Sequence, residues 1–155
     1  MHIEITRNAR HGQAIDGTLR INGNEVCHTA ENTLAALPRG TWPVLIHTCR
    51  RYRRKMPLII TQDTTRSGWT LDLMARCNAC RPTEIPPNNN TRLPLRCPML
   101  KPGNGVHRRT DGSIIVGEPA EAIGCLLHPE RHFNRLIDRL DKAQNRGETI
   151  TLTIN

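Results

Sequence analysis

The sequence predicts a mainly β (α+β) fold: a small antiparallel sandwich or barrel of about eight short strands, with one C-terminal amphipathic helix and a final strand. Short runs alternate apolar and polar residues, and turn residues separate them. A helical apolar repeat occurs near the C-terminus. Aromatic residues are only 3% of the chain, so the core must consist of Leu, Ile and Val. At 155 residues we expect a single domain, 1–155.

The first half contains short strands in quick succession. Asn22-Gly23 stands between two alternating runs, which strongly indicates a hairpin. Residues 37–40, Leu-Pro-Arg-Gly, form an expected turn, and Pro43 places the following strand at an edge or at its own start. The expected strands of this half are 1–7, 18–21, 25–29, 41–49, 57–61 and 69–73.

The C-terminal part contains the helix. After an expected strand at 113–116, Pro129 and Glu130 open the helix and Gly147 ends it. Its apolar residues recur at the spacing of one buried face: Phe133, Leu136, Ile137, Leu140 and Ala143. Residues 149–154 then alternate cleanly, which predicts a final strand.

Residues 76–104 form a proline- and cysteine-rich excursion, which we expect to be irregular. It contains Cys77, Cys80 and Cys97, and thiolates at this spacing can hold a structural zinc ion with His107 as a fourth ligand. A disulfide or plain reduced thiols are the alternatives, and the expected chemistry requires no cofactor. His107 cannot be both a zinc ligand and a general base.

The chain carries a net charge of +8, from 22 basic and 14 acidic residues. Such a surface could bind nucleic acid, anionic lipid or an anionic polymer such as a cell wall. The basic run 50–55 is either a polyanion-binding loop or a solvated hairpin tip, and no nucleic-acid motif accompanies it, so nucleic acid is the weaker expectation. No apolar run reaches the roughly 20 residues of a membrane span. The N-terminus has no apolar signal core, so we expect a cytoplasmic protein as synthesised, which another system delivers if it acts in the periplasm.

Cys125 and His107 are the candidate catalytic pair. A thiol is a good nucleophile only as a thiolate, and an imidazole within reach can take its proton. Gly124 allows the backbone to approach a substrate carbonyl closely. The alternative is that Cys125 is a small buried apolar residue between Ile123 and Leu126.

The order of several segments resembles a family of small uncharacterised domains from bacteria and phages. The matching segments are 17–23, 26–31, 37–44, 124–127, 133–136 and 149–154. The histidine followed by Gly-Cys also resembles the active site of L,D-transpeptidases, β-rich enzymes whose cysteine accepts an acyl group from a peptidoglycan stem peptide. Gly117-Glu118-Pro119-Ala120 is similar to the segment that leads into their cysteine.

This resemblance implies an acyl transferase or hydrolase in which Cys125 is the nucleophile and His107 its base. The backbone N–H groups of Gly124 and Cys125 would then bind the oxyanion. The chain departs from those enzymes at Ile123 and Leu127, where they have a polar or small residue and an arginine.

The charge of that missing arginine would come from Arg108, Arg109 or Arg131. The alternative function is a non-catalytic binding module of phage or secretion-system origin, organised by the cysteines of the excursion. A basic nucleic-acid-binding domain is the third. The sequence does not indicate an oligomeric state.

Overall fold

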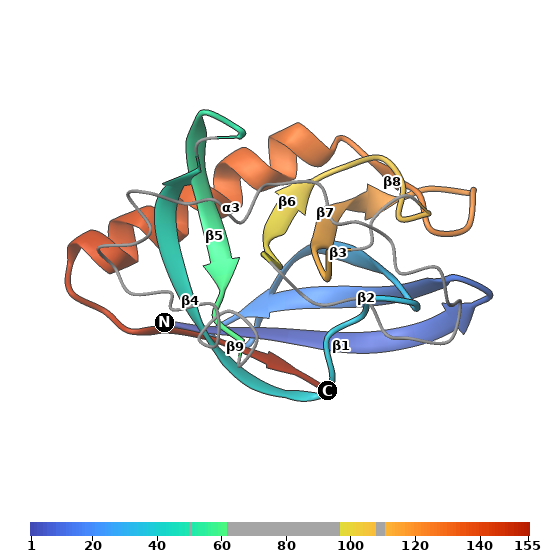
Figure 1. The fold of residues 1–155 in the computed structure, drawn as a ribbon, viewed down its shortest axis with the longest axis horizontal. Helices are drawn as coiled ribbons and strands as arrows, with labels where there is room; N and C mark the ends of the chain where they lie inside the picture. The colour runs from blue at the N-terminus through green and yellow to red at the C-terminus, as the bar shows by residue number, and fades with distance from the viewer. Residues whose placement is uncertain (50, 62–96, 108–110) are drawn as a thin grey trace, which may run out of the picture.

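The computed structural model describes residues 1–49, 51–61, 97–107 and 111–155 (Figure 1). In this part of the chain nine strands form one sheet, and helix α3 lies between the eighth strand and the ninth. The strands are β1 (His2–His11), β2 (Ala14–Ile21), β3 (Asn24–Asn32), β4 (Gly40–Cys49), β5 (Arg54–Ile59), β6 (Leu100–Pro102), β7 (Ile114–Pro119), β8 (Leu126–Leu127) and β9 (Ile150–Ile154). The helix α3 spans Pro129–Asn145. The mainly β class with one C-terminal helix and a final strand is confirmed.

The sheet is mixed and nearly closes on itself. Its order is β5-β4-β9-β1-β2-β3-β7-β6, with β8 paired to β7. Two pairs, β1 with β9 and β6 with β7, run parallel, which the alternation pattern did not reveal. The two edge strands, β5 and β6, approach each other. Leu58 forms a β-bridge with Met99, and the Ile59 N–H donates to the Pro98 carbonyl over 2.9 Å. The sheet therefore curves into a barrel-like shape.

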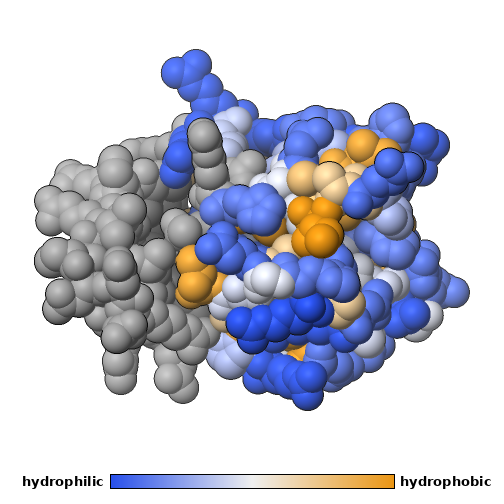
Figure 2. Space-filling model, turned by 90° about the vertical axis from the view of Figure 1, so that its right-hand side faces the viewer, coloured by the Kyte–Doolittle hydropathy of each residue, from blue (hydrophilic) through white to orange (hydrophobic). Residues whose placement is uncertain are grey.

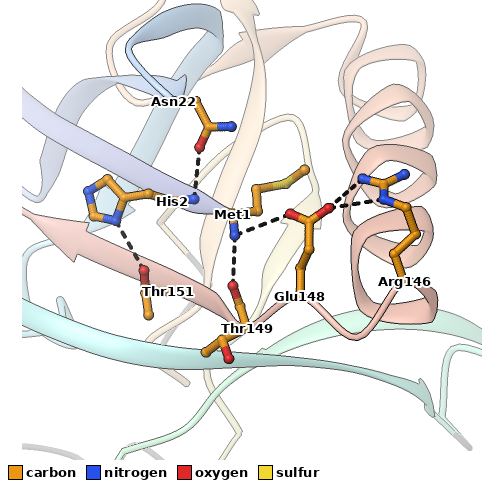
Figure 3. Close-up of polar contacts among 7 residues, drawn as sticks. All are labelled: Met1, His2, Asn22, Arg146, Glu148, Thr149 and Thr151. Carbon is orange, nitrogen blue, oxygen red and sulfur yellow. Dashed lines mark hydrogen bonds and ion pairs between the residues drawn. The ribbon is translucent and has the colours of Figure 1, made fainter.

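The parallel pairing of β1 and β9 brings the N-terminal residues beside the last turn of the chain (Figure 3). The Met1 amino group donates to the Thr149 carbonyl over 2.7 Å and lies 3.4 Å from the Glu148 carboxylate. Glu148 also pairs with Arg146, just after α3. These contacts connect the end of the helix to the sheet.

The inner face of the sheet packs against α3. The buried side of the helix consists of Phe133, Leu136, Leu140 and Ala143. These side chains share one apolar cluster with alternate residues of the strands, among them Ile3 and Leu19. The sequence pattern identified this helical face correctly, because the burial of a helix repeats every three to four residues.

The outer face of β2, β3 and β7 carries a separate, smaller apolar cluster. It consists of Ala14, Ala30, Val106, Ile115 and Leu126. A β-bulge between Arg7 and Ala9 shifts the register of β1 by one residue, so that His11 lies opposite Ala14 on this face. Because side chains alternate along a strand, a one-residue shift moves every later side chain of β1 to the other face. The bulge thus places His11 on the outer face.

Some predicted segments lie outside the described residues. These are the expected strand 69–73 and most of the excursion, including Cys77 and Cys80. The end of the excursion contains β6, so this part is not irregular. In the described ranges no helix has the length and apolarity that crossing a membrane requires.

A candidate cysteine site on the outer face

Cys125 lies on a short segment that pairs with residues preceding β7. Gly105 and Cys125 form an isolated antiparallel bridge, and the Val106 N–H donates to the Gly124 carbonyl over 3.1 Å. Val106 belongs to the outer apolar cluster. This packing fixes the backbone around Cys125 although the segment itself is short.

Gly124 is required by the geometry of this segment. Its φ is +71°, in the left-handed region that side chains disfavour. A Cβ at this position would lie 2.8 Å from both the Ala14 Cβ and the Val106 Cγ2. Gly105 is also close to the site, because a Cβ there would lie 3.7 Å from the Cys125 Sγ. The chain therefore approaches itself closely where the sequence places Gly-Cys.

Cys125 is partly exposed, unlike the other described cysteines. Cys27, Cys49 and Cys97 are all buried. Burial raises the pKa of the Cys27 thiol to about 12, so this thiol stays protonated at neutral pH. Of the described thiols, only that of Cys125 is positioned to meet a ligand.

Cys125 opens into a pocket of about 300 Å³. The described residues that line the pocket are His11, Asp16, Gly17, His28, Thr29, 119–124 and Leu126. Ile123 is 58% exposed and Leu127, next to the pocket, is 49% exposed. Figure 2 looks onto this end of the molecule, where apolar side chains stand at the surface among polar ones. The pocket thus has an apolar rim.

The titratable groups of the pocket come from three strands and the Cys125 loop. His11, Asp16 and His28 lie on the outer face of β1, β2 and β3, and Glu121 lies in the loop before Cys125. The His11 Nε2 is 3.8 Å from the Asp16 Oδ2. No lysine or arginine is among the described lining residues. In a chain of net charge +8, this pocket carries only carboxylates and imidazoles.

Sequence reasoning did not identify His11, Asp16 or His28. They are distant from Cys125 in the chain, and strand pairing brings them together. Nothing in the sequence reveals the bulge in β1 that turns His11 outward, since no glycine or proline marks it. The turn at Gly12, directly after His11, went unrecognised in the sequence, although a glycine there is compatible with a hairpin end.

His107 lies near the Cys125 segment but not in the pocket wall. It is exposed, and its Nε2 is 3.6 Å from the position that a Cβ of Gly124 would occupy. Among the described residues, no hydrogen bond or ion pair joins His107 to Cys125. The expected proximity of His107 to Gly-Cys is therefore present, without a direct contact to the thiol.

Two details differ from what the resemblance implies. The Cys125 N–H donates to the Ala122 carbonyl over 3.0 Å, so it is engaged in a turn and does not point at a substrate. The Arg131 side chain is 59% exposed, its Nη1 lies 4.0 Å from the Glu118 Oε1, and Arg131 is not among the described lining residues of the pocket. Arg108 and Arg109 lie outside the described residues.

The structure leaves the zinc hypothesis as a prediction. Cys97 is buried, whereas Cys77 and Cys80 lie outside the described residues. Within the described ranges, no three His, Cys, Asp or Glu side chains are grouped so that they could hold a metal ion.

The described part of the basic run, residues 51–55, forms the tip of the β4–β5 hairpin and the start of β5, as one of the two interpretations expected. Arg54 pairs with Glu130 over 2.9 Å and its guanidinium lies 4.3 Å from the centre of the Phe133 ring. Lys55 pairs with Asp141 over 2.6 Å. Two of these charges therefore hold α3 against the hairpin, and fewer are available for a polyanion.

An ion pair between a buried lysine and a partly exposed aspartate joins β6 to the residues just before β7. Lys101 is only 2% exposed, and its Nζ lies 2.6 Å from the Asp111 Oδ2. Burial alone would raise the pKa of Asp111, but the charge of Lys101 and hydrogen bonds from Lys101 and Ser113 outweigh it and hold this pKa below its ordinary value. The Ser113 hydroxyl accepts a hydrogen bond from the Met99 N–H. This cluster is part of the scaffold, because every member bonds to another.

No known protein-family description matches the chain, and comparisons with curated proteins and with solved structures gave no match either.

Proposed function

We propose that this protein is a cysteine-dependent acyl transferase or hydrolase that acts on peptidoglycan stem peptides, with Cys125 as its nucleophile. The observation that carries the proposal is the position of Cys125. It is the partly exposed thiol of the described chain, and it opens into a pocket with two imidazoles and two carboxylates. Covalent acyl transfer needs a reachable thiol and groups that can move protons beside it.

The backbone around the thiol supports this role. The left-handed conformation of Gly124 and the β-bridge between Gly105 and Cys125 hold the Cys125 backbone in one position. A positioned nucleophile reacts faster than a mobile one, because the entropic cost of orienting it is already met. His107, against Gly124, remains the sequence-based candidate for taking the thiol proton.

The substrate class rests on the resemblance of the Gly-Cys segment to L,D-transpeptidases. The pocket is compatible with a peptide, since Ile123 offers an apolar rim and Asp16 and Glu121 offer carboxylates to an amine. An amine is a chemically suitable acceptor for an acyl-enzyme. An anionic wall polymer would also be attracted by the net charge of +8.

The test is to look for a covalent adduct after incubation with a synthetic stem tetrapeptide. Intact-mass spectrometry should detect one acyl group per chain in the wild type and in Cys27→Ala, and none in Cys125→Ser. Cys27→Ala is the matched control, because its thiol is buried on the other face. A folded wild type that forms no adduct, or an adduct that persists in Cys125→Ser, would reject the proposal.

A non-catalytic binding module is the second candidate. The engaged N–H of Cys125 favours it, because an oxyanion site needs free donors. In that case the tetrapeptide, or a larger wall fragment, would bind reversibly with no change in mass. Cys125→Ser would then leave the affinity unchanged.

A further inference from the structure

We infer that His11, oriented by Asp16, is the general base of the second half-reaction at this site: it activates the nucleophile that releases the acyl group from Cys125. This inference rests on the proposed function. It assigns a role to the part of the pocket lining that β1 and β2 provide, and it leaves the first step, acylation of the thiol, to groups near Cys125.

The geometry of β1 and β2 supports this role. The bulge in β1 turns His11 to the same face as Asp16, and the two side chains stand diagonally across the hairpin. The Nε2 of His11 faces the Asp16 carboxylate at 3.8 Å. At this distance the contact is an electrostatic one and not a hydrogen bond. When substrate binding draws the two side chains together, a hydrogen bond from Nε2 to Asp16 would orient the ring and leave the other nitrogen, Nδ1, as the proton acceptor. Among the described residues Nδ1 has no hydrogen-bond partner.

This imidazole and the thiol belong to the lining of one pocket. Both line the same space of about 300 Å³, which is enough for an acyl group and a small nucleophile together. A base for the second step does not need to touch the thiol. It needs to reach the incoming water or amine on the pocket side of the thioester.

The step balances without a further reactant. The oxygen of water, or the nitrogen of an amine, forms a bond to the carbonyl carbon of the Cys125 thioester while His11 Nδ1 takes one of its protons. The C–S bond then breaks and its electron pair returns to sulfur. His11 gives the proton back to the thiolate, directly or through water, and a carboxylic acid or an amide leaves.

His28 is the other imidazole in the pocket, but its carboxylate neighbour differs. Its Nε2 lies 4.0 Å from Glu25, which is not among the described lining residues. The partner of His11 is itself part of the pocket wall. His11 is therefore the imidazole that is oriented from within the pocket.

The experiment uses p-nitrophenyl acetate with the full chain, because release of nitrophenolate separates the two steps. Acylation appears as a burst of one nitrophenolate per chain, and deacylation sets the steady rate that follows. We expect His11→Gln to keep the size and rate of the burst while the steady rate falls about 100-fold, the lower range of general-base contributions. Intact mass should then show an acetyl group accumulating on Cys125.

Asp16→Asn should lower the steady rate less than His11→Gln, and Asp16→Glu should restore part of it. His2→Gln is the matched control, since His2 lies at the opposite end of β1 from His11 and its ring contacts Thr151 (Figure 3). Circular dichroism and thermal unfolding of each variant verify the fold.

The outcomes separate the two proposals. An unchanged steady rate in His11→Gln, a slowed burst in that variant, or a loss seen in His28→Gln instead would overturn the role of His11 and leave Cys125 as nucleophile. A wild type without a burst, or a burst that survives Cys125→Ser, would overturn the proposed function as well.

Discussion

The two faces of the sheet around β2, β3 and β7 differ in how far they bury a cysteine. On the inner face Cys27 lies in the large apolar cluster with α3, and burial raises its pKa to about 12. On the outer face Cys125 lies beside a smaller apolar cluster of five residues and remains partly exposed. The difference shows that the layer covering each face decides which thiol is accessible.

The largest expected difference between the two faces is in stability. Phe133→Ala removes a fully buried ring from the inner core, and we expect a loss of about 3–5 kcal/mol in the free energy of unfolding. Leu126→Ala on the outer face should cost less, about 2 kcal/mol, because the smaller cluster around it can collapse. Urea denaturation measures both, and equal losses would show that the outer cluster is as much a core as the inner one.

The ion pair between Lys101 and Asp111 gives the next largest expected effect on the free energy of unfolding. Lys101→Met leaves the Asp111 carboxylate without its cation, and we expect a loss of about 2–3 kcal/mol at pH 7, below the range for a fully buried pair because Asp111 is 38% exposed. The pKa of Asp111 is lower in the folded chain than its ordinary value of 3.8, so the pair stabilises the fold above that value. This contribution is lost as the pH falls below 3.8 toward the folded pKa.

The variant should therefore lose less stability than the wild type on acidification. Urea denaturation at pH 7 and at about pH 3 measures this difference. If Lys101→Met is as acid-sensitive as the wild type, Asp111 does not depend on Lys101 for its charge.

A smaller difference in stability is expected between alanine substitutions at Gly124 and at an ordinary turn glycine. Gly124→Ala combines a left-handed φ with contacts of 2.8 Å to Ala14 and Val106, and we expect a loss of about 2 kcal/mol. Gly12→Ala is the matched control, because its φ is +58° but nothing lies within 4 Å of the added Cβ. It should cost about 1 kcal/mol. Similar melting temperatures for the two variants would mean that the Cys125 segment moves away easily.

The sequence predicted the scaffold better than the site. Alternation and turn residues identified the early hairpins, and the repeat of Phe133 and Leu136 identified the buried side of α3. Each of these patterns lies within a single short segment of the sequence. The parallel pairing of β1 with β9 depends on residues more than 140 positions apart, so no window of sequence contains it.

The same reason explains the candidate site. Gly124-Cys125 was visible because the close approach requires a glycine next to the thiol. His11 and Asp16 were not visible, because a bulge sets their direction and strand pairing brings them to Cys125. His107 was nearer in sequence and lies beside Gly124, outside the described pocket wall.

The most direct test of this account is the alkylation rate of each cysteine with iodoacetamide at pH 7, read by peptide mass spectrometry on the native chain. The account predicts that Cys125 reacts at least as fast as a free cysteine, and that Cys27 reacts only when the protein unfolds. Protection of Cys125 equal to that of Cys27 would contradict it, because a thiol that small reagents do not reach cannot serve as the nucleophile of this pocket.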